Sequence, residues 1–210
     1  IKFLSLKNFP VRDLASFVGK LQSLRLAIGP IISIMCKALY KVISLAPFWS
    51  SFVKLDSNAR FEVEWWRDNL QYFSSYPIVL DDTSVHVDCR ISSDASGTGY
   101  FVVNLDRSVK LKSEPFTLFE SLQSSTYREL RALYRTYTDP VILKKFAGLT
   151  LCHYTDSKSV ANILYKGSSI HLLNVMIREI FLSLRNHVIK LVPFWVSRDN
   201  NFIKLADLGS

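Results

Sequence analysis

The hydrophobic pattern of this chain changes at about Pro77, and the change predicts two differently built parts. Before it, apolar residues recur at helical spacing, as they do between Arg12 and Gly29. After it, alternating or continuous apolar segments are interleaved with helical ones, an order typical of a mixed α/β sheet with helices packed on it. The boundary is predicted at about residues 76–83, with a helical part over residues 1–80 and an α/β domain over residues 81–210.

Three helices are predicted in the first part. The first runs from Arg12 to the Gly29-Pro30 pair, which would end it, and the second spans residues 31–45. The third begins after Asp56 and Ser57, one of which is expected to be the N-cap.

The second part is expected to contain three strands, a helix, a strand, two helices, a strand and a short final helix. The predicted strands are residues 85–91, 100–105, 108–115, 149–156 and 188–196, and the predicted helices are residues 124–137, 157–166 and 172–186.

Four acidic side chains fall where strands or helices of this domain begin or end. Asp94 directly follows the first predicted strand, and Glu129 lies one turn into a helix. Asp156 ends a strand, and Asp207 lies in the final segment. These positions could direct all four carboxylates into one site, and carboxylate oxygens are the ligands that Mg²⁺ prefers.

Each carboxylate also has an ordinary structural interpretation. Asp94 could be a turn residue in the sequence Asp-Ala-Ser-Gly, and Glu129 could be a solvated helix residue. Asp156 could serve as the N-cap of the helix that follows it. His153 and His187 are interpreted as ordinary histidines rather than ligands.

Four short motifs occur in order along the second part. They are Ser93–Ser96 (SDAS), Ser124–Leu130 (SSTYREL), Thr155–Val160 (TDSKSV) and a closing pair formed by Trp195–Arg198 (WVSR) and Ala206-Asp207. Over Val85–Asp207 the chain therefore resembles the RNase H domain of retroelement reverse transcriptases, especially the DIRS-like group. Residues 1–80 resemble the thumb or connection segment that follows the polymerase palm, and no palm motif with paired aspartates is present in the chain.

The resemblance implies an RNase H-like mixed five-stranded sheet with flanking helices, preceded by a small α-helical subdomain. It implies a metal-dependent endonuclease that cleaves the RNA strand of RNA–DNA hybrids. Two Mg²⁺ or Mn²⁺ ions would be held by Asp94, Glu129, Asp156 and Asp207, with Asp94 bridging both. The sequence departs from the family in two places: two extra residues precede Ala206, and the loop at residues 197–201 lacks a histidine.

Composition is consistent with a nucleic-acid partner. The formal net charge is +8, which favours a polyanion over a membrane surface. Basic residues of the helical part could bind phosphates or could form a solvated helical face: Lys7, Arg12, Lys20, Arg25, Lys37 and Lys41. The better candidates, nearer the proposed site, are Arg128, Lys158, Lys166 and Arg198. The 3 scattered cysteines indicate a reducing, intracellular location, cytoplasmic or nuclear.

Two other functions remain open at this point. The same fold could be a catalytically inactive module that binds nucleic acid or protein. It could also be a structural subunit beside the polymerase palm of the same polyprotein. Dependence on a metal would separate the enzyme from both, and salt-dependent binding of a hybrid would separate the two from each other.

Overall fold

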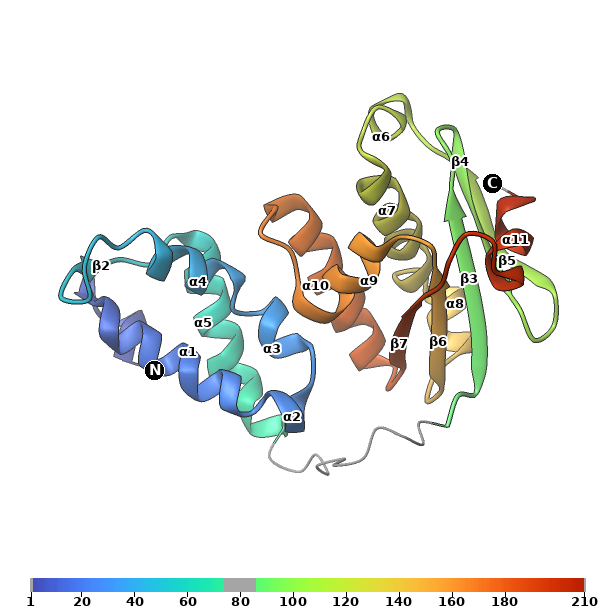
Figure 1. Ribbon diagram of the computed structural model, residues 1–210. Helices are drawn as coiled ribbons and strands as arrows, with labels where there is room; N and C mark the ends of the chain where they lie inside the picture. Colours follow the sequence, from blue (N-terminus) through green and yellow to red (C-terminus); the bar gives the residue numbers. More distant parts are fainter. Residues whose placement is uncertain (1, 74–85, 210) are drawn as a thin grey trace. The chain divides into compact units, whose positions relative to one another are not determined.

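The computed structural model describes residues 2–73 and 86–209 (Figure 1). The chain divides into two compact units, residues 1–83 and 84–210, and each is described by itself. The boundary predicted at residues 76–83 and the start of the first predicted strand, at Val85, lie outside the described residues. In the part of the chain that the structure describes, no helix is both long and apolar enough to cross a lipid bilayer.

The first unit is helical, as predicted. A short antiparallel ladder joins β1 (Phe9–Pro10) to β2 (Phe52–Val53). The helices are α1 (Val11–Ser23), α2 (Arg25–Ile28), α3 (Ile31–Ile34), α4 (Lys37–Ser44) and α5 (Ser57–Asn69), with 3₁₀ turns at Lys2–Leu4 and Leu70–Phe73. Asp56 is the N-cap of α5, and its side chain accepts a hydrogen bond from the Ala59 N–H.

Two of the helices predicted here are each broken into two pieces. The first is interrupted at Leu24, between α1 and α2, and the second at Met35 and Cys36, between α3 and α4. Apolar periodicity continues across both breaks, so the pattern alone does not reveal them.

Helix α5 supplies the partners that make the second break stable. The buried Glu62 carboxylate accepts hydrogen bonds from the N–H groups of Ala38 and Leu39, both at 3.0 Å. The Trp66 indole N–H donates to the Met35 carbonyl at 2.9 Å. Backbone groups that a helix end leaves without an intrahelical partner are thus satisfied from another helix.

Replacing Glu62 with glutamine is expected to destabilise the first turn of α4 by about 1–2 kcal/mol, because an amide offers only one acceptor oxygen to two N–H donors. Faster hydrogen exchange at the amides of Ala38 and Leu39 would report this change. Glu64→Gln is the matched control, since Glu64 is exposed and pairs only loosely with Arg60, at 3.8 Å. Unchanged exchange in Glu62→Gln would contradict the capping role.

The second unit contains a five-stranded sheet in the order β5-β4-β3-β6-β7. Its strands are β3 (Cys89–Ala95), β4 (Gly99–Asn104), β5 (Val109–Pro115), β6 (Thr150–Thr155) and β7 (Lys190–Trp195). The first three pair antiparallel, and β6 runs parallel to both β3 and β7. The predicted RNase H-like mixed sheet, with flanking helices and a preceding helical part, is confirmed.

Helices pack on both faces of this sheet. They are α6 (Leu118–Ser121), α7 (Ser125–Tyr137), α8 (Pro140–Lys145), α9 (Lys158–Lys166), α10 (His171–Asn186) and α11 (Asn201–Asp207). His153 of β6 contacts Tyr137 of α7, whereas the next residue, Tyr154, contacts Phe202 of α11. Because side chains alternate along a strand, α7 and α11 lie on opposite faces (Figure 1).

The element predictions in this unit differ from the structure at a few points. The first strand begins at Cys89 and continues to Ala95, so Asp94 lies within the strand, not after it. The pairing of β3 with β4 continues one residue beyond Asp94, because Ala95 lies opposite Tyr100. Helices α6 and α8 were not predicted, because helices of four and six residues are too short to show a periodicity.

The two edges of the sheet are built differently from its centre. At one edge, β5 carries Lys110 and Lys112, and its register with β4 shifts between Val102 and Val103. At the other edge, β7 contains Pro193, which has no N–H to donate.

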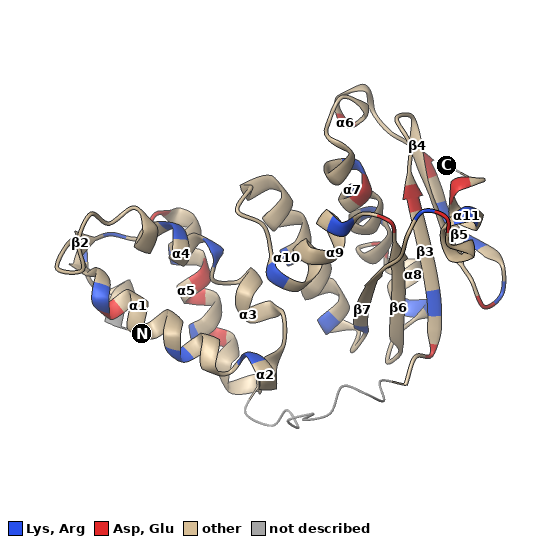
Figure 2. Ribbon diagram, viewed as in Figure 1, with Lys and Arg blue, Asp and Glu red and all other residues tan. Residues whose placement is uncertain are grey.

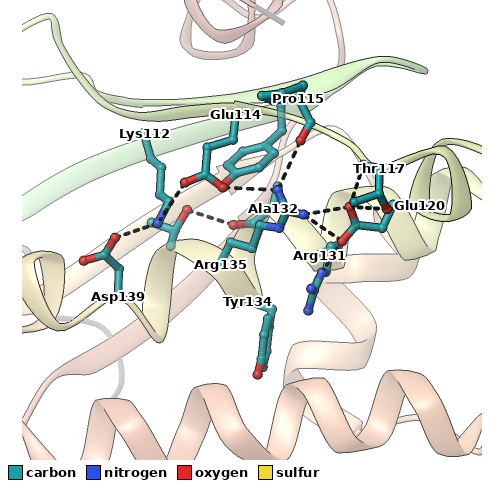
Figure 3. A network of polar contacts seen from close by, with 12 residues as sticks. Lys112, Glu114, Pro115, Thr117, Glu120, Arg131, Ala132, Tyr134, Arg135 and Asp139 are labelled. Carbon is teal, nitrogen blue, oxygen red and sulfur yellow. Dashed lines mark hydrogen bonds and ion pairs between the residues drawn. The ribbon is translucent and has the colours of Figure 1, made fainter.

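An ion-pair network fastens α6 to α7 (Figure 3). The Glu120 side chain, only 5% exposed, accepts hydrogen bonds from Arg131 and Arg135 at distances of 2.6–2.9 Å. The same carboxylate closes a capping box with Thr117 at the start of α6. Arg128 adds a second tie, because its guanidinium donates to the backbone carbonyls of Ser121 and Gln123. Helix α7 is therefore tied to the α6 segment both near its start, through Arg128, and in its second half, through Arg131 and Arg135.

Candidate active site

Two of the predicted carboxylates come from strand β3 and from the residue that directly follows its parallel neighbour β6. Ser92 of β3 pairs with Tyr154 of β6 in the parallel register. Asp94 and Asp156 each lie two residues further along the chain. Parallel strands run in the same direction, so both carboxylates reach the same end of the sheet.

The third carboxylate comes from α7. Ser124 is the N-cap of this helix and accepts a hydrogen bond from the Tyr127 N–H at 3.3 Å, so the helix begins one residue later. Glu129 is then one turn into the helix, on its buried side, with an exposed fraction of 6%.

The structure brings these three side chains together. One oxygen from each of Asp94, Glu129 and Asp156 lies within 4.8 Å of the others. Asp94 is buried like Glu129, while the Asp156 side chain is 19% exposed. In Figure 2, acidic residues of β3, α7 and the loop after β6 gather at one end of the sheet. We call these three residues the carboxylate cluster.

Burial and mutual repulsion make the cluster costly as a set of anions. Burial raises the pKa of Glu129 well above its usual value, and the charges of Asp94 and Asp156 raise it further. The pKa of Asp156 is also raised, first by burial and then by the charge of Asp94. The cluster therefore favours a proton or a bound cation over free negative charge.

The carboxylate cluster suits a hard divalent cation. Its three donors are all carboxylate oxygens, the type that Mg²⁺ and Mn²⁺ prefer. Glu129 Oε2 is buried and has no hydrogen-bond partner among the described residues, and such an atom is costly to bury unless something binds it. The donor set and this unsatisfied oxygen both fit a metal ion.

Asp207 lies at the margin of the cluster. It is the last residue of α11, which packs on β3, and its side chain is 29% exposed. Burial and the charge of Asp94 raise its pKa, so the two carboxylates are electrostatic neighbours. Arg198 joins Asp207 to the cluster, with nitrogens 3.8 Å from Asp207 Oδ1 and 3.9 Å from Asp156 Oδ2.

The other predicted phosphate-binding residues are placed differently from one another. The Lys158 amine is 4.3 Å from the ring centre of Trp195, whose indole donates to the Asp156 carbonyl, so Lys158 borders the cluster. Lys166 closes α9, about 12 Å further along the helix axis, and is remote from the cluster. Arg128 is committed to the carbonyls before α7, which leaves its guanidinium little freedom to bind a ligand.

A buried polar chain behind the cluster was not predicted. His153 is fully buried, with Nε2 2.9 Å from Ser93 Oγ and Nδ1 2.7 Å from the Tyr137 hydroxyl. These hydrogen bonds tie together β3, β6 and α7, the three elements that carry the carboxylate cluster. The only hint in the sequence is that Ser93 precedes Asp94. This position does not reveal that His153 and Tyr137 lie beside Ser93 in the fold.

The ordinary interpretations of three carboxylates are wrong. Asp94 is a buried strand residue, not a turn residue, and Glu129 is buried rather than solvated. The N-cap of α9 is Ser157, whose side chain accepts from the Val160 N–H, and not Asp156. Tertiary packing, which turn preferences ignore, buries Asp94 and Glu129, whereas a local hydrogen bond makes Ser157 the cap.

No protein-family model and no curated protein matches this chain. Among solved structures, LC11-RNase H1 in complex with an RNA/DNA hybrid is similar with 18% identity and a TM-score of 0.46, over 58% of this chain and 93% of that one. The foamy viral protease-reverse transcriptase in complex with an RNA/DNA hybrid is similar with 13% identity and a TM-score of 0.40, over 92% of this chain and 26% of that one. The fold assignment rests on strand order and pairing, not on these similarities.

Proposed function

We propose that the second unit is a metal-dependent ribonuclease of the RNase H type, which cleaves the RNA strand of RNA–DNA hybrids. The observation that carries the proposal is the carboxylate cluster, formed by Asp94, Glu129 and Asp156 from three separate elements within 4.8 Å. The four motifs between Ser93 and Asp207 support it, because they occur in the order of the family that the chain resembles.

Each group of residues would have its own role. Asp94, Glu129 and Asp156, with Asp207 at the margin, would hold two Mg²⁺ or Mn²⁺ ions. Bound there, the ions would activate water for attack on a phosphodiester and stabilise the departing 3′-oxygen. Lys158 and Arg198 border the cluster and would position the phosphate backbone. Contacts to 2′-hydroxyl groups would select RNA over DNA.

The wider setting follows from the same motifs. We infer that the chain is part of a retroelement reverse transcriptase of the DIRS-like group, in which residues 1–80 connect to a polymerase palm of the same polyprotein. The reaction would take place inside the cell, in the cytoplasm or nucleus. The alternative is an inactive module with the same fold, favoured by the missing histidine in residues 197–201.

Cleavage of a labelled RNA–DNA hybrid in Mg²⁺ or Mn²⁺ tests the proposal. We expect cleavage of the RNA strand only, none of a DNA duplex of the same sequence, and none in EDTA. Asp94→Asn should reduce cleavage to the level of the EDTA reaction, because a ligand of the carboxylate cluster loses its charge. Glu179→Gln is the matched control, since Glu179 lies on α10 outside the carboxylate cluster and accepts a hydrogen bond from Tyr134.

The other outcomes are equally informative. Full activity in Asp94→Asn would rule out this site. Tight, salt-dependent binding of the hybrid without cleavage would support the inactive binding module. Neither binding nor cleavage would support a structural subunit that acts only beside the polymerase.

A further inference from the structure

Arg198 occupies an unusual position for a residue expected to bind nucleic acid. Its guanidinium lies between two carboxylates of the site, 3.9 Å from Asp156 Oδ2 and 3.8 Å from Asp207 Oδ1. At these distances the contacts are ion pairs without hydrogen bonds. The side chain is also 73% exposed, so both ion pairs are weak.

The electrostatic environment explains why a cation lies there. Asp94 faces both Asp156 and Asp207, and its charge raises the pKa of each carboxyl. Arg198 opposes that effect at both residues. Arg128 opposes it at Glu129, but Arg128 is tied to backbone carbonyls. Arg198 is thus an exchangeable counter-ion, whereas Arg128 is a permanent one.

We propose that Arg198 is a resident counter-ion of the site. It competes with the divalent metal for the carboxylates, and once the metal binds it pairs with the phosphate backbone instead. The proposal rests on the function proposed above. A metal ion at Asp156 and Asp207 neutralises the charge that attracts the guanidinium. The released side chain then lies beside the carboxylate cluster, where its guanidinium can donate two hydrogen bonds to one phosphate group.

This competition has two measurable consequences. The metal should bind more tightly when Arg198 is neutral, since a positive charge a few ångströms away no longer repels it. The metal should strengthen binding of the hybrid less when Arg198 is absent, since binding of the two ligands is reciprocally coupled through the released side chain.

Calorimetric titration with Mn²⁺ alone tests the first consequence without any catalytic readout. We expect Arg198→Gln to bind Mn²⁺ about three- to tenfold more tightly than the wild type, an effect reduced by added salt. Arg198→Lys retains the charge and should bind like the wild type. Arg107→Gln is the matched control, because Arg107 is exposed in the β4–β5 turn, at the other end of the sheet. A gain in affinity cannot result from loss of the fold.

Equal or weaker Mn²⁺ binding by Arg198→Gln would overturn the counter-ion role while leaving the nuclease proposal intact. If instead the wild type and Asp94→Asn bind Mn²⁺ alike, the carboxylate cluster is not a metal site and both proposals fail. The second consequence is measured as hybrid affinity with and without Ca²⁺, at constant ionic strength. If Ca²⁺ increases the affinity for the hybrid as much in Arg198→Gln as in the wild type, the proposed transfer of Arg198 to the phosphate backbone is wrong.

Discussion

Replacing Glu120 with glutamine is expected to destabilise the second unit by about 3–5 kcal/mol, the cost of removing one partner from a buried ion pair. Burial alone would raise the pKa of Glu120, but hydrogen bonds from Thr117 and Arg131 outweigh it and lower the pKa to about 2. A carboxyl whose pKa is lowered from 4.5 to about 2 is stabilised by about 3 kcal/mol at neutral pH. Arg131 and Arg135 would lose the anion that both of them bind.

Urea unfolding at pH 7 measures this loss, with Glu179→Gln as the control for removing one negative charge from the same unit. The sign of the pH dependence is fixed by the lowered pKa: the contribution of Glu120 is complete above pH 4.5 and is lost as the pH falls toward 2. A destabilisation below about 1 kcal/mol would show that the network is no stronger than an exposed ion pair.

Lowering the pH from 7 to 4.5 is expected to remove about 2.5 kcal/mol of stability through His153 alone. Burial lowers the pKa of His153 to about 3 in the folded protein, against 6.5 for an ordinary histidine. Between pH 6.5 and about 3, His153 is therefore protonated in the unfolded chain but neutral in the folded protein. The stability is fully present above pH 6.5 and declines until the pH reaches about 3.

The carboxylate cluster titrates in the opposite sense, so the effect of His153 must be isolated. The raised pKa values of Glu129, Asp156 and Asp207 mean that acid relieves their repulsion and stabilises the fold. His153→Gln keeps the cluster but cannot titrate. The difference in unfolding free energy between wild type and His153→Gln, measured from pH 7 to 4.5, should shrink by the stated amount. A constant difference would show that His153 takes up protons equally in both states.

Local sequence signals predicted the parts of this fold that are locally determined. The start of α7 was predicted to within one residue, because a serine N-cap precedes a clear apolar period. The predicted order of long elements in the second unit is also the observed one. The break at Met35 and Cys36 could not be predicted, because its partners are distant along the sequence. Glu62 bonds Ala38 and Leu39 across 24 and 23 residues, and Trp66 bonds Met35 across 31 residues.

In the candidate site, too, some features were predicted from the sequence, whereas others depend on contacts between distant residues. Three residues of the motifs, Asp94, Glu129 and Asp156, lie together in the structure. The contact of Arg198 with Asp156 and Asp207, and the enclosure of His153 by Ser93 and Tyr137, depend on which face of each strand meets which helix. No local pattern encodes such a pairing.

The edges of the sheet bear on how this chain behaves at high concentration. An open strand edge is a template on which a second copy can add its own strand and begin to aggregate. Lysines on β5, with the register shift beside them, and Pro193 on β7 are the features by which natural sheets discourage such additions. The two strands that lie furthest from the central strand β3 thus carry features that oppose the addition of a strand from a second copy.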